Sequence, residues 1–310
     1  MRHHILSLVL LLAGLGVGAR AETCLSPFVR VLDRPERFLY VWSVDADAKD
    51  SDFLAVVDVD IASPTYGQVI NTVPVGSPGN EPHHFGFTDD RTQIWAASLF
   101  SSRIFIFDVA TDPAHPKLVK TIANFKELTG LASPHTVYAI PGRMVVSTLS
   151  AADGGLPAGL AEFTNEGNYI RTIRFPSEAP YGYDIQVKPD LNRMITSSFT
   201  PYRNYSKPFA QMDLKDFGDT LIVWDFQKRE VLEIGKTDKA PLEIRWARQP
   251  GRNYGFTNCA LGDSLWLFRQ KGDGHFEFKK VADTGKLPVD LRQTADDRFL
   301  FVSNFMSHEI

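Results

Sequence analysis

Three histidines occupy similar settings in two parts of the sequence. His83 and His84 are adjacent between a proline and a glycine, and His135 also follows a proline. Neutral imidazole is a common protein ligand for copper and zinc, and three imidazoles with one open position suit a Lewis-acid or a redox metal. The three residues therefore predict a metal site, with copper as the metal. Their spacing matches no compact metal signature, so polar histidines that line a channel remain the alternative.

The adjacent histidines need a local bend if both are to bind one ion. On a regular strand the side chains of His83 and His84 would point to opposite faces. Pro82 stiffens the approach to the pair, and Gly86 allows close passage of the backbone. We therefore expect a turn on which both imidazoles converge, with His135 brought alongside from the next repeat.

Two acidic residues in apolar surroundings are candidates for proton transfer. Asp184 ends the stretch Tyr181–Asp184, and Glu243 lies within Pro241–Arg245. Glu243 and Arg245 are two residues apart on a predicted strand and share one face, which favours a buried ion pair that holds sheets in register. Alternatively, Glu243 or Asp184 orients a histidine ligand or moves a proton.

Charge and motifs argue against several classes of protein. The formal net charge is −4, and no segment is rich in Lys and Arg. A nucleic-acid partner would require a concentrated basic face, so we expect none. The sequence contains no nucleophile elbow of hydrolases, no phosphate-binding loop and no dinucleotide fingerprint.

The first residues have the pattern of an export signal. A basic start precedes the apolar run Ile5–Val17, and Ala19 and Ala21 supply the small residues that cleavage requires. The run is too short to span a bilayer comfortably, which disfavours the alternative of a membrane anchor. Residues 1–21 are therefore predicted to be a signal peptide, and residues 22–310 to be a periplasmic or secreted chain without a membrane anchor.

Two cysteines, Cys24 and Cys259, remain in the predicted mature chain. An oxidising compartment would allow them to pair. A disulfide also requires a specific distance and orientation, which the sequence does not give. Both a disulfide and two free thiols are therefore compatible with the sequence.

The mature chain has the pattern of β-strands throughout. Short apolar runs alternate with clusters of Gly, Pro, Asn and Asp, and no segment of a dozen residues shows a sustained helical period. The stretches Phe125–Leu128 and Met212–Lys215 are expected to form single helical turns in loops. The sequence thus predicts an all-β fold.

A unit of strands recurs along the chain, which predicts a β-propeller. Equivalent strand ends lie roughly 40 to 60 residues apart, a spacing that suits four-stranded blades. A β-sandwich or a β-helix fits this pattern less well. The equivalent strand ends are Asp58, Asp108, Phe163, Asp225 and Phe268.

The end of the chain repeats an earlier segment. Thr294–Asn304 restates Thr88–Ser98, and a full blade follows the earlier copy, whereas the chain stops at Ile310 after the later one. A propeller closes its ring to remove sheet edges. We therefore expect a chain truncated at its C-terminal end after about five blades. A five-bladed protein with an irregular tail is the alternative.

Several motifs resemble, in the same order, those of the selenium-binding protein and methanethiol oxidase family. The resemblance runs from about Phe53 to the end of the chain. The matching segments are Asp58–Asp60, Ser63–Ile70, His83–His84, Ser98–Ile104, Pro116–Leu118, Gly182–Asp184, Pro241–Arg245 and Asp296–Leu300.

This resemblance implies a seven-bladed propeller and an exported copper enzyme. Such an enzyme oxidises methanethiol with O2 and water to formaldehyde, hydrogen sulfide and hydrogen peroxide. The family's metal histidines carry over to His83, His84 and His135. The thiol would bind copper as a thiolate, a soft ligand, and Asp184 or Glu243 would move the proton.

Two departures from the family pattern affect these expectations. Gly67 stands where animal members carry a selenium-linked cysteine, so selenium binding through that thiol is not expected. The family also has a late histidine that lies beyond the end of this chain. A secreted propeller that binds selenium, metal or a protein partner without catalysis is the alternative function. A lactonase-like propeller would instead need calcium and acidic ligands, and the sequence indicates no oligomeric state.

Overall fold

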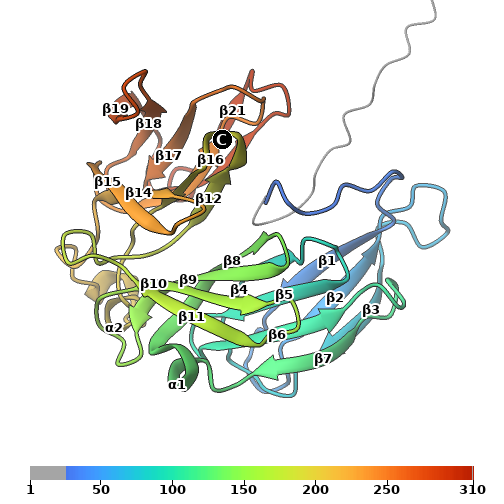
Figure 1. Cartoon of the computed structure of the whole chain (residues 1–310). Helices are drawn as coiled ribbons and strands as arrows, with labels where there is room; N and C mark the ends of the chain where they lie inside the picture. Colours follow the sequence, from blue (N-terminus) through green and yellow to red (C-terminus); the bar gives the residue numbers. More distant parts are fainter. Residues whose placement is uncertain (1–25, 309) are drawn as a thin grey trace, which may run out of the picture.

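A computed structural model describes residues 26–308 and 310, which form six antiparallel sheets in chain order (Figure 1). The predicted signal peptide, residues 1–21, and Cys24 lie outside the described residues. Within the described residues Cys259 forms no disulfide and is buried, and burial raises the pKa of its thiol to about 12.

The first three sheets contain eleven strands. The first sheet consists of β1 (Phe38–Ser43), β2 (Phe53–Asp58) and β3 (Val69–Pro74). The second sheet consists of β4 (Pro82–Phe87), β5 (Gln93–Ser98), β6 (Arg103–Asp108) and β7 (Lys117–Ile122). The third sheet consists of β8 (Leu131–Ile140), β9 (Arg143–Ala151), β10 (Gly159–Thr164) and β11 (Tyr169–Arg174).

The last three sheets contain ten strands. The fourth sheet consists of β12 (Ile185–Lys188), β13 (Arg193–Thr196), β14 (Thr220–Asp225) and β15 (Glu230–Lys236). The fifth sheet consists of β16 (Pro241–Trp246), β17 (Tyr254–Cys259), β18 (Ser264–Gln270) and β19 (Phe276–Asp283). The sixth sheet consists of β20 (Pro288–Gln293) and β21 (Leu300–Asn304).

The sheets follow one another as the blades of a propeller do. In each four-stranded sheet every strand pairs with the next strand in the chain. Neighbouring sheets meet through their first strands, because β4 contacts β8, and β16 contacts both β12 and β20. The predicted all-β propeller class is confirmed, and the number of blades stays a prediction. The first strands matter most for function, since they carry the histidines and the two predicted acids lie on or next to them.

Helical segments in the described residues are short and lie in loops. They are α1 (Phe125–Thr129), η1 (Pro189–Leu191), α2 (Tyr202–Tyr205) and η2 (Phe209–Gln211). No helix within residues 26–308 is both long enough and apolar enough to cross a membrane.

One of the two predicted helical turns is confirmed and the other is wrong. The turn predicted at Phe125–Leu128 is α1. The stretch Met212–Lys215 instead forms a non-helical turn that follows η2. There the backbone N–H of Asp213 donates to the side chain of Asn204 at 2.8 Å, and the N–H of Lys215 donates to the carboxylate of Asp213 at 2.9 Å. Such side-chain bonds compete with the helical hydrogen-bond ladder.

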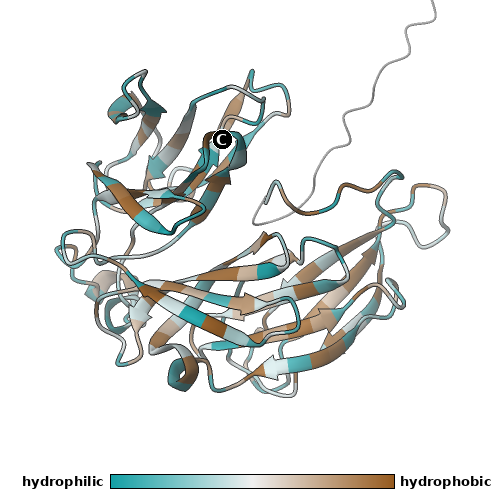
Figure 2. Ribbon diagram, in the orientation of Figure 1, coloured by the Kyte–Doolittle hydropathy of each residue, from teal (hydrophilic) through white to brown (hydrophobic). Residues whose placement is uncertain are grey.

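Large aromatic side chains fill the space between adjacent sheets. The rings of Trp42 on β1 and Phe105 on β6 lie 5.6 Å apart, and those of Trp95 on β5 and Phe163 on β10 lie 5.8 Å apart. All four side chains are buried. Apolar residues recur along the strands of every sheet in Figure 2. Each sheet therefore buries its apolar face against its neighbour, as the repeat predicts.

A buried carboxylate also joins two neighbouring sheets. Glu162 on β10 is fully buried and forms ion pairs with Arg143, Arg171 and Arg229 at 3.3, 3.0 and 2.8 Å. Arg229 lies between β14 and β15, so this contact links the third sheet to the fourth. Pairing to several guanidinium groups offsets the cost of burying the charge.

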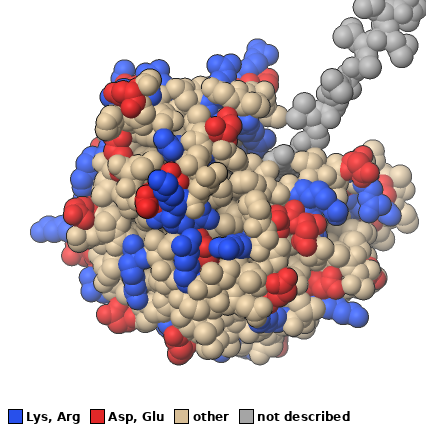
Figure 3. Space-filling model, in the orientation of Figure 1, with Lys and Arg blue, Asp and Glu red and all other residues tan. Residues whose placement is uncertain are grey.

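Charged side chains are otherwise spread over the surface. On the face shown in Figure 3, Lys and Arg side chains are interspersed with Asp and Glu, and no large area carries one sign. The concentrated basic face that nucleic-acid binding requires is not visible on this side of the molecule.

Candidate metal centre

Four of the first strands begin with the same local structure. Each has a proline at or near its start, a residue with positive φ before that proline, and a register shift after it. The prolines are Pro82, Pro134, Pro241 and Pro288, and the preceding residues are Glu81, Ser133, Ala240 and Leu287. Such a shift is a β-bulge, which lets two successive side chains face one partner residue.

The bulge in β4 explains how adjacent histidines reach one site. Pro82 pairs with Ser98 and Phe85 pairs with Ala96, so His83 and His84 lie together opposite one residue of β5. The expected turn at this position is wrong, because both histidines belong to the strand. The expected convergence does occur, because the bulge breaks the alternation of side chains that a regular strand imposes.

The same shift on β8 places the third histidine. Pro134 pairs with Thr148 and Val137 with Val146, so His135 and Thr136 share one opposing residue. Because β4 contacts β8, the bulges of the two strands lie side by side. The structure thus brings His135 next to the pair on β4, as the sequence predicts.

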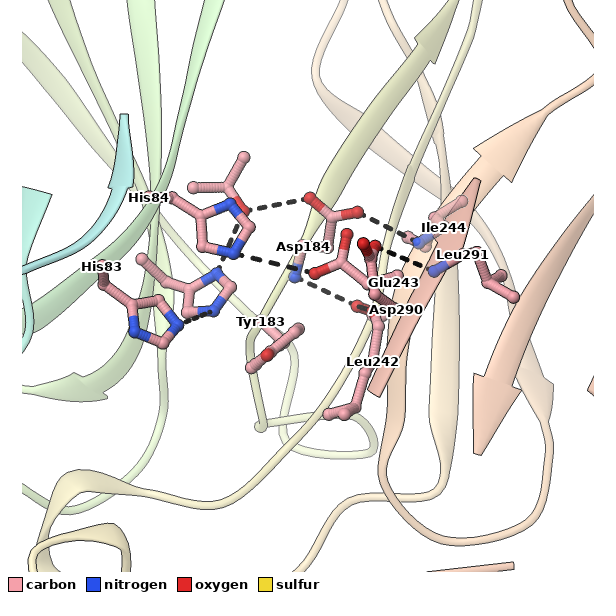
Figure 4. Close-up of polar contacts among 12 residues, drawn as sticks. His83, His84, Tyr183, Asp184, Leu242, Glu243, Ile244, Asp290 and Leu291 are labelled. Carbon is pink, nitrogen blue, oxygen red and sulfur yellow. Dashed lines mark hydrogen bonds and ion pairs between the residues drawn. The ribbon is translucent and has the colours of Figure 1, made fainter. Parts of the chain in front are cut away.

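The three imidazoles form a compact cluster. One ring nitrogen from each of His83, His84 and His135 lies within 4.8 Å of the others. Nε2 of His83 is 3.0 Å from Nε2 of His135. The rings of His83 and His84 lie 5.0 Å apart between ring centres, side by side in Figure 4. Within residues 26–308 this is the only group of three or more His, Cys, Asp and Glu side chains placed to hold a metal ion.

Burial keeps two of these histidines neutral. His135 is fully buried, and the side chain of His84 is 14% exposed. Burial lowers the pKa of both imidazoles well below the usual range, and the neighbouring histidines lower it further. Neutral imidazoles offer a lone pair at neutral pH, so the donor set fits copper or zinc.

Hydrogen bonds fix the orientation of His135. Its Nδ1 lies 3.0 Å from the hydroxyl of Thr136, and that hydroxyl donates to Oδ1 of Asp184 at 3.0 Å. The hydroxyl has one hydrogen and uses it for Asp184, so it accepts the hydrogen of Nδ1. His135 therefore directs the lone pair of Nε2 toward the other histidines, in the manner of a metal ligand held by a polar partner.

The two predicted acids lie beside this cluster (Figure 4). Oε1 of Glu243 is 3.7 Å from Nε2 of His84, and Oε2 of Glu243 accepts a hydrogen bond from Arg245 at 2.6 Å. Oδ2 of Asp184 accepts from the backbone N–H of Ile244 at 3.0 Å and from Arg245 at 3.3 Å. The predicted buried ion pair of Glu243 and Arg245 is confirmed.

An additional acid, the partly buried Asp290 on β20, joins this charge cluster. Its carboxylate lies 3.5 Å from Arg245 and 3.1 Å from Arg292. Burial raises the pKa of Asp290, and the charge of Glu243 raises it further. Burial likewise raises the pKa of Asp184 from 3.8 to about 7, again with help from Glu243. A single guanidinium group thus faces three carboxyl groups.

The pKa of Asp184 predicts a pH dependence for the stability of the metal-free chain. Between about pH 4 and pH 7 the folded chain keeps a proton that the unfolded chain has lost, so this contribution to stability is lost as the pH rises through that range. Asparagine does not titrate, so Asp184→Asn removes this pH dependence. We expect the free energy of unfolding in urea, taken as variant minus parent, to be more favourable to the variant at about pH 8 than at about pH 5. An equal difference at both pH values would contradict the shift.

Several residues of the site were missed by sequence reasoning. Thr136 and Asp290 occupy the second position after a first-strand proline, as His84 and Glu243 do, so the repeated spacing could have identified them. The residues missed are Glu81, Thr136, Tyr183, Tyr205 and Asp290. Tyr205 lies in the loop between β13 and β14, and no local signal marks it.

Aromatic side chains close one side of the cluster. The ring of Tyr183 lies 3.8 Å from that of His135, between ring centres. Phe199 follows at 5.2 Å from Tyr183, and Tyr205 at 5.9 Å from Phe199. We call Tyr183, Phe199 and Tyr205 the aromatic wall. Tyr183 covers His135 with apolar surface, and Phe199 and Tyr205 extend this surface, which favours a small apolar ligand.

A separate cavity of about 420 Å³ is lined by Lys188, Trp246 and Gln293 among others, and it also borders Arg245. None of the three histidines lines it. The amino group of Lys188 donates to the backbone carbonyls of Ala247 and Gln249 at 3.0 and 2.9 Å. The cavity therefore lies apart from the histidine cluster. The ammonium group of Lys188 already has two hydrogen-bond acceptors in the protein.

Comparison with known proteins agrees with the motifs. Residues 20–310 match the family described as 56 kDa selenium-binding protein (SBP56). The chain is 41% identical over 304 residues to a methanethiol oxidase from Hyphomicrobium sp., covering 92% of this chain and 69% of that protein. It is 40% identical over 314 residues to a methanethiol oxidase from Ruegeria pomeroyi, covering 92% of this chain and 72% of that protein.

Solved structures share the fold. A hypothetical selenium-binding protein from Sulfolobus tokodaii superposes with a TM-score of 0.80 at 24% identity, covering 87% of this chain and 70% of that one. The β-propeller domain of Cps50 (Swd1) from Myceliophthora thermophila superposes with a TM-score of 0.58 at 11% identity, covering 87% and 77%. The match over residues 20–310 and the identity to the two bacterial oxidases show that this chain belongs to the selenium-binding protein and methanethiol oxidase family.

Proposed function

We propose that this protein is a copper-dependent methanethiol oxidase. It would convert methanethiol, O2 and water to formaldehyde, hydrogen sulfide and hydrogen peroxide, a conversion in which all atoms balance. The observation that carries the proposal is the convergence of three imidazoles on one site. Burial keeps His84 and His135 neutral, so that both can bind a metal ion. The chain that carries this site is a relative of two bacterial methanethiol oxidases.

His83, His84 and His135 would hold the copper ion. Bound there, copper would supply a soft site for a thiolate and the redox chemistry that joins thiol oxidation to the reduction of O2. Neutral nitrogen ligands without a carboxylate keep the site soft, which suits a sulfur substrate better than a hard oxygen ligand set would.

The polar residues behind the histidines would move the thiol proton. The hydroxyl of Thr136 links Nδ1 of His135 to the carboxyl group of Asp184 by two hydrogen bonds of 3.0 Å each, which places this acid behind the histidines. The pKa of Asp184, raised to about 7, lets this carboxyl group take up or release a proton near neutral pH. Glu243, 3.7 Å from His84, is the second candidate for this role.

The aromatic wall would admit a small thiol and exclude bulk water. Tyr183 is partly buried, and this burial raises its pKa well above the usual range, so its hydroxyl stays protonated. Its ring therefore acts as an apolar surface beside His135. Methanethiol has one methyl group, and apolar walls around a metal site control solvent access.

The predicted signal peptide leads us to propose a periplasmic or secreted location. Export would expose the chain to an oxidising compartment, where Cu²⁺ and O2 are compatible with the proposed reaction. Cleavage after Ala21 is checked by N-terminal sequencing of protein recovered outside the cytoplasm.

The proposed function is tested by removing the metal and adding it back. We expect methanethiol-dependent O2 uptake to fall to the background after chelation and to return with Cu²⁺ but not with Zn²⁺, because zinc has no redox chemistry. O2 consumption, formaldehyde and sulfide are measured on the same samples. Full activity in a sample shown to be free of metal would overturn copper dependence.

A second form of the protein sharpens this test. A chain extended to the full length of the bacterial relatives is assayed beside the present one, since the present chain covers 69% and 72% of those proteins. Activity in both forms would show that the three histidines suffice. Copper binding without O2 uptake in both forms would support a metal-binding propeller instead of an oxidase.

A further inference from the structure

The residue before each first-strand proline has a conformation that the blade imposes. Glu81, Ser133, Ala240 and Leu287 all precede such a proline, with φ of 57°, 55°, 58° and 54°. Serine, alanine and leucine adopt this conformation at the other three positions, so the conformation itself does not require an acidic residue. Glutamate occurs here only on the strand that carries His83 and His84. The identity of Glu81 therefore needs an explanation from its side chain.

The carboxylate of Glu81 contacts one of the three histidines directly. Its Oε1 lies 3.2 Å from Nδ1 of His83. A carboxylate only accepts hydrogen bonds, so Nδ1 carries the hydrogen and Nε2 of His83 keeps its lone pair. That Nε2 is the nitrogen 3.0 Å from Nε2 of His135, on the side where the three rings meet.

A tyrosine from the loop between β13 and β14 holds the same carboxylate. The hydroxyl of Tyr205, on α2, donates to Oε1 of Glu81 at 3.2 Å. The ring of Tyr205 packs at 6.1 Å from Phe100 and 5.9 Å from Phe199. Its neighbour Asn204 is buried and donates to Thr200 at 2.8 Å, which pins the helix to its loop. Tyr205 is therefore fixed by packing as well as by this hydrogen bond.

The remaining oxygen of Glu81 contributes no hydrogen bond to the fold. Oε2 is buried and makes no hydrogen bond within the described residues. A buried acceptor without a partner destabilises the folded state. This cost offsets part of what the two contacts of Oε1 contribute. Replacing Glu81 should therefore lower stability less than replacing Glu162, which pairs with three arginines.

We propose that Glu81 is the positioning residue of His83, and that Tyr205 holds Glu81 in place. The carboxylate fixes the tautomer and the ring orientation in which Nε2 of His83 faces the metal site. The hydrogen bond from Tyr205 thus connects the metal site on β4 and β8 to α2, a helix in the loop between β13 and β14. The inference rests on the metal site of the proposed function and assigns two residues that lie outside its ligand set.

The test measures Cu²⁺ affinity by competition with a chelator of known affinity on the whole chain. We expect Glu81→Ala to weaken Cu²⁺ binding by about 10- to 100-fold, the usual effect of removing the partner of a metal-bound histidine. Glu81→Gln and Tyr205→Phe should each weaken Cu²⁺ binding measurably, but by less than about 10-fold, since an acceptor or the ring packing is retained. Electron paramagnetic resonance of the Cu²⁺ form should change in the nitrogen couplings of one imidazole.

A matched control is available at the surface. Asp112 lies 3.0 Å from Nδ1 of His115, and both side chains are exposed, so Asp112→Ala removes the same type of contact far from the cluster. It should change Cu²⁺ affinity by less than about twofold. Thermal unfolding of the metal-free variants separates positioning from stability, because a structural role would lower both together.

Each outcome decides the proposal. A folded Glu81→Ala protein with the parent's Cu²⁺ affinity would overturn it and leave the proposed function intact. If Glu81→Ala does not fold, parental affinity in both Glu81→Gln and Tyr205→Phe overturns it in the same way. A parent chain that binds no Cu²⁺ would overturn both the metal site and this inference, and the parent measurement alone identifies that case.

Discussion

Replacing His135 with asparagine is expected to abolish copper binding and methanethiol-dependent O2 uptake together. His135 is fully buried, and its Nε2 faces His83 at 3.0 Å while its Nδ1 is held by Thr136. Loss of a partner behind a ligand typically costs about 10- to 100-fold in metal affinity, so loss of the ligand itself should cost more than about 100-fold. Cu²⁺ affinity and O2 uptake are measured on the same preparation.

His115→Asn is the matched control for this variant. His115 lies in an exposed loop and pairs with Asp112, away from the three-histidine cluster. The control should keep both the copper affinity and the activity of the parent. Circular dichroism shows whether His135→Asn is folded. A folded His135→Asn protein that binds Cu²⁺ as the parent does would exclude His135 as a ligand.

The largest effect on stability is expected at Arg245. Arg245 is 4% exposed and is the guanidinium group that faces Glu243, Asp184 and Asp290. Arg245→Met leaves a buried glutamate without its cation, and breaking a buried pair in this way typically costs about 3–5 kcal/mol. We expect a loss of that size in the free energy of unfolding, measured with urea at neutral pH.

Two further variants isolate the cause. Arg245→Met combined with Glu243→Gln should recover part of the loss, because the unpaired charge is removed as well. Arg269 and Glu277 form an ion pair of the same 2.6 Å length, but Arg269 is 50% exposed, so Arg269→Met should cost less than about 1 kcal/mol. Equal losses in the free energy of unfolding for Arg245→Met and Arg269→Met would show that burial does not increase the effect of breaking the ion pair.

Much of the proposed chemistry follows from residue type and local pattern. The repeated strand ends predict blades because apolar runs and turn residues are local signals. The pairing of Glu243 with Arg245 follows from the alternation of side chains on one strand. The three histidines could be selected because few other histidines lie in the mature chain. His83 and His135 each follow a proline directly, and His84 is the next residue after His83.

Other features depend on contacts between segments far apart in the chain. The turn expected at His83 and His84 is a bulge in β4, since register is fixed by pairing with β5. The helical turn expected at Met212–Lys215 is absent because the side chain of Asn204 takes up the backbone N–H of Asp213, and the carboxylate of Asp213 takes up that of Lys215. Local propensity does not include the contact with Asn204.

The strand repeat, the candidate ligands and the acids near them can be recognised in the amino-acid sequence. The meeting of the histidines of β4 and β8 within 4.8 Å depends on the folded chain, and so does the contact of Tyr205 with Glu81 across 124 positions. The physical reason is that ligand geometry depends on strand register and on the packing of neighbouring blades. Both are set by many contacts acting together, and no single stretch of sequence carries them.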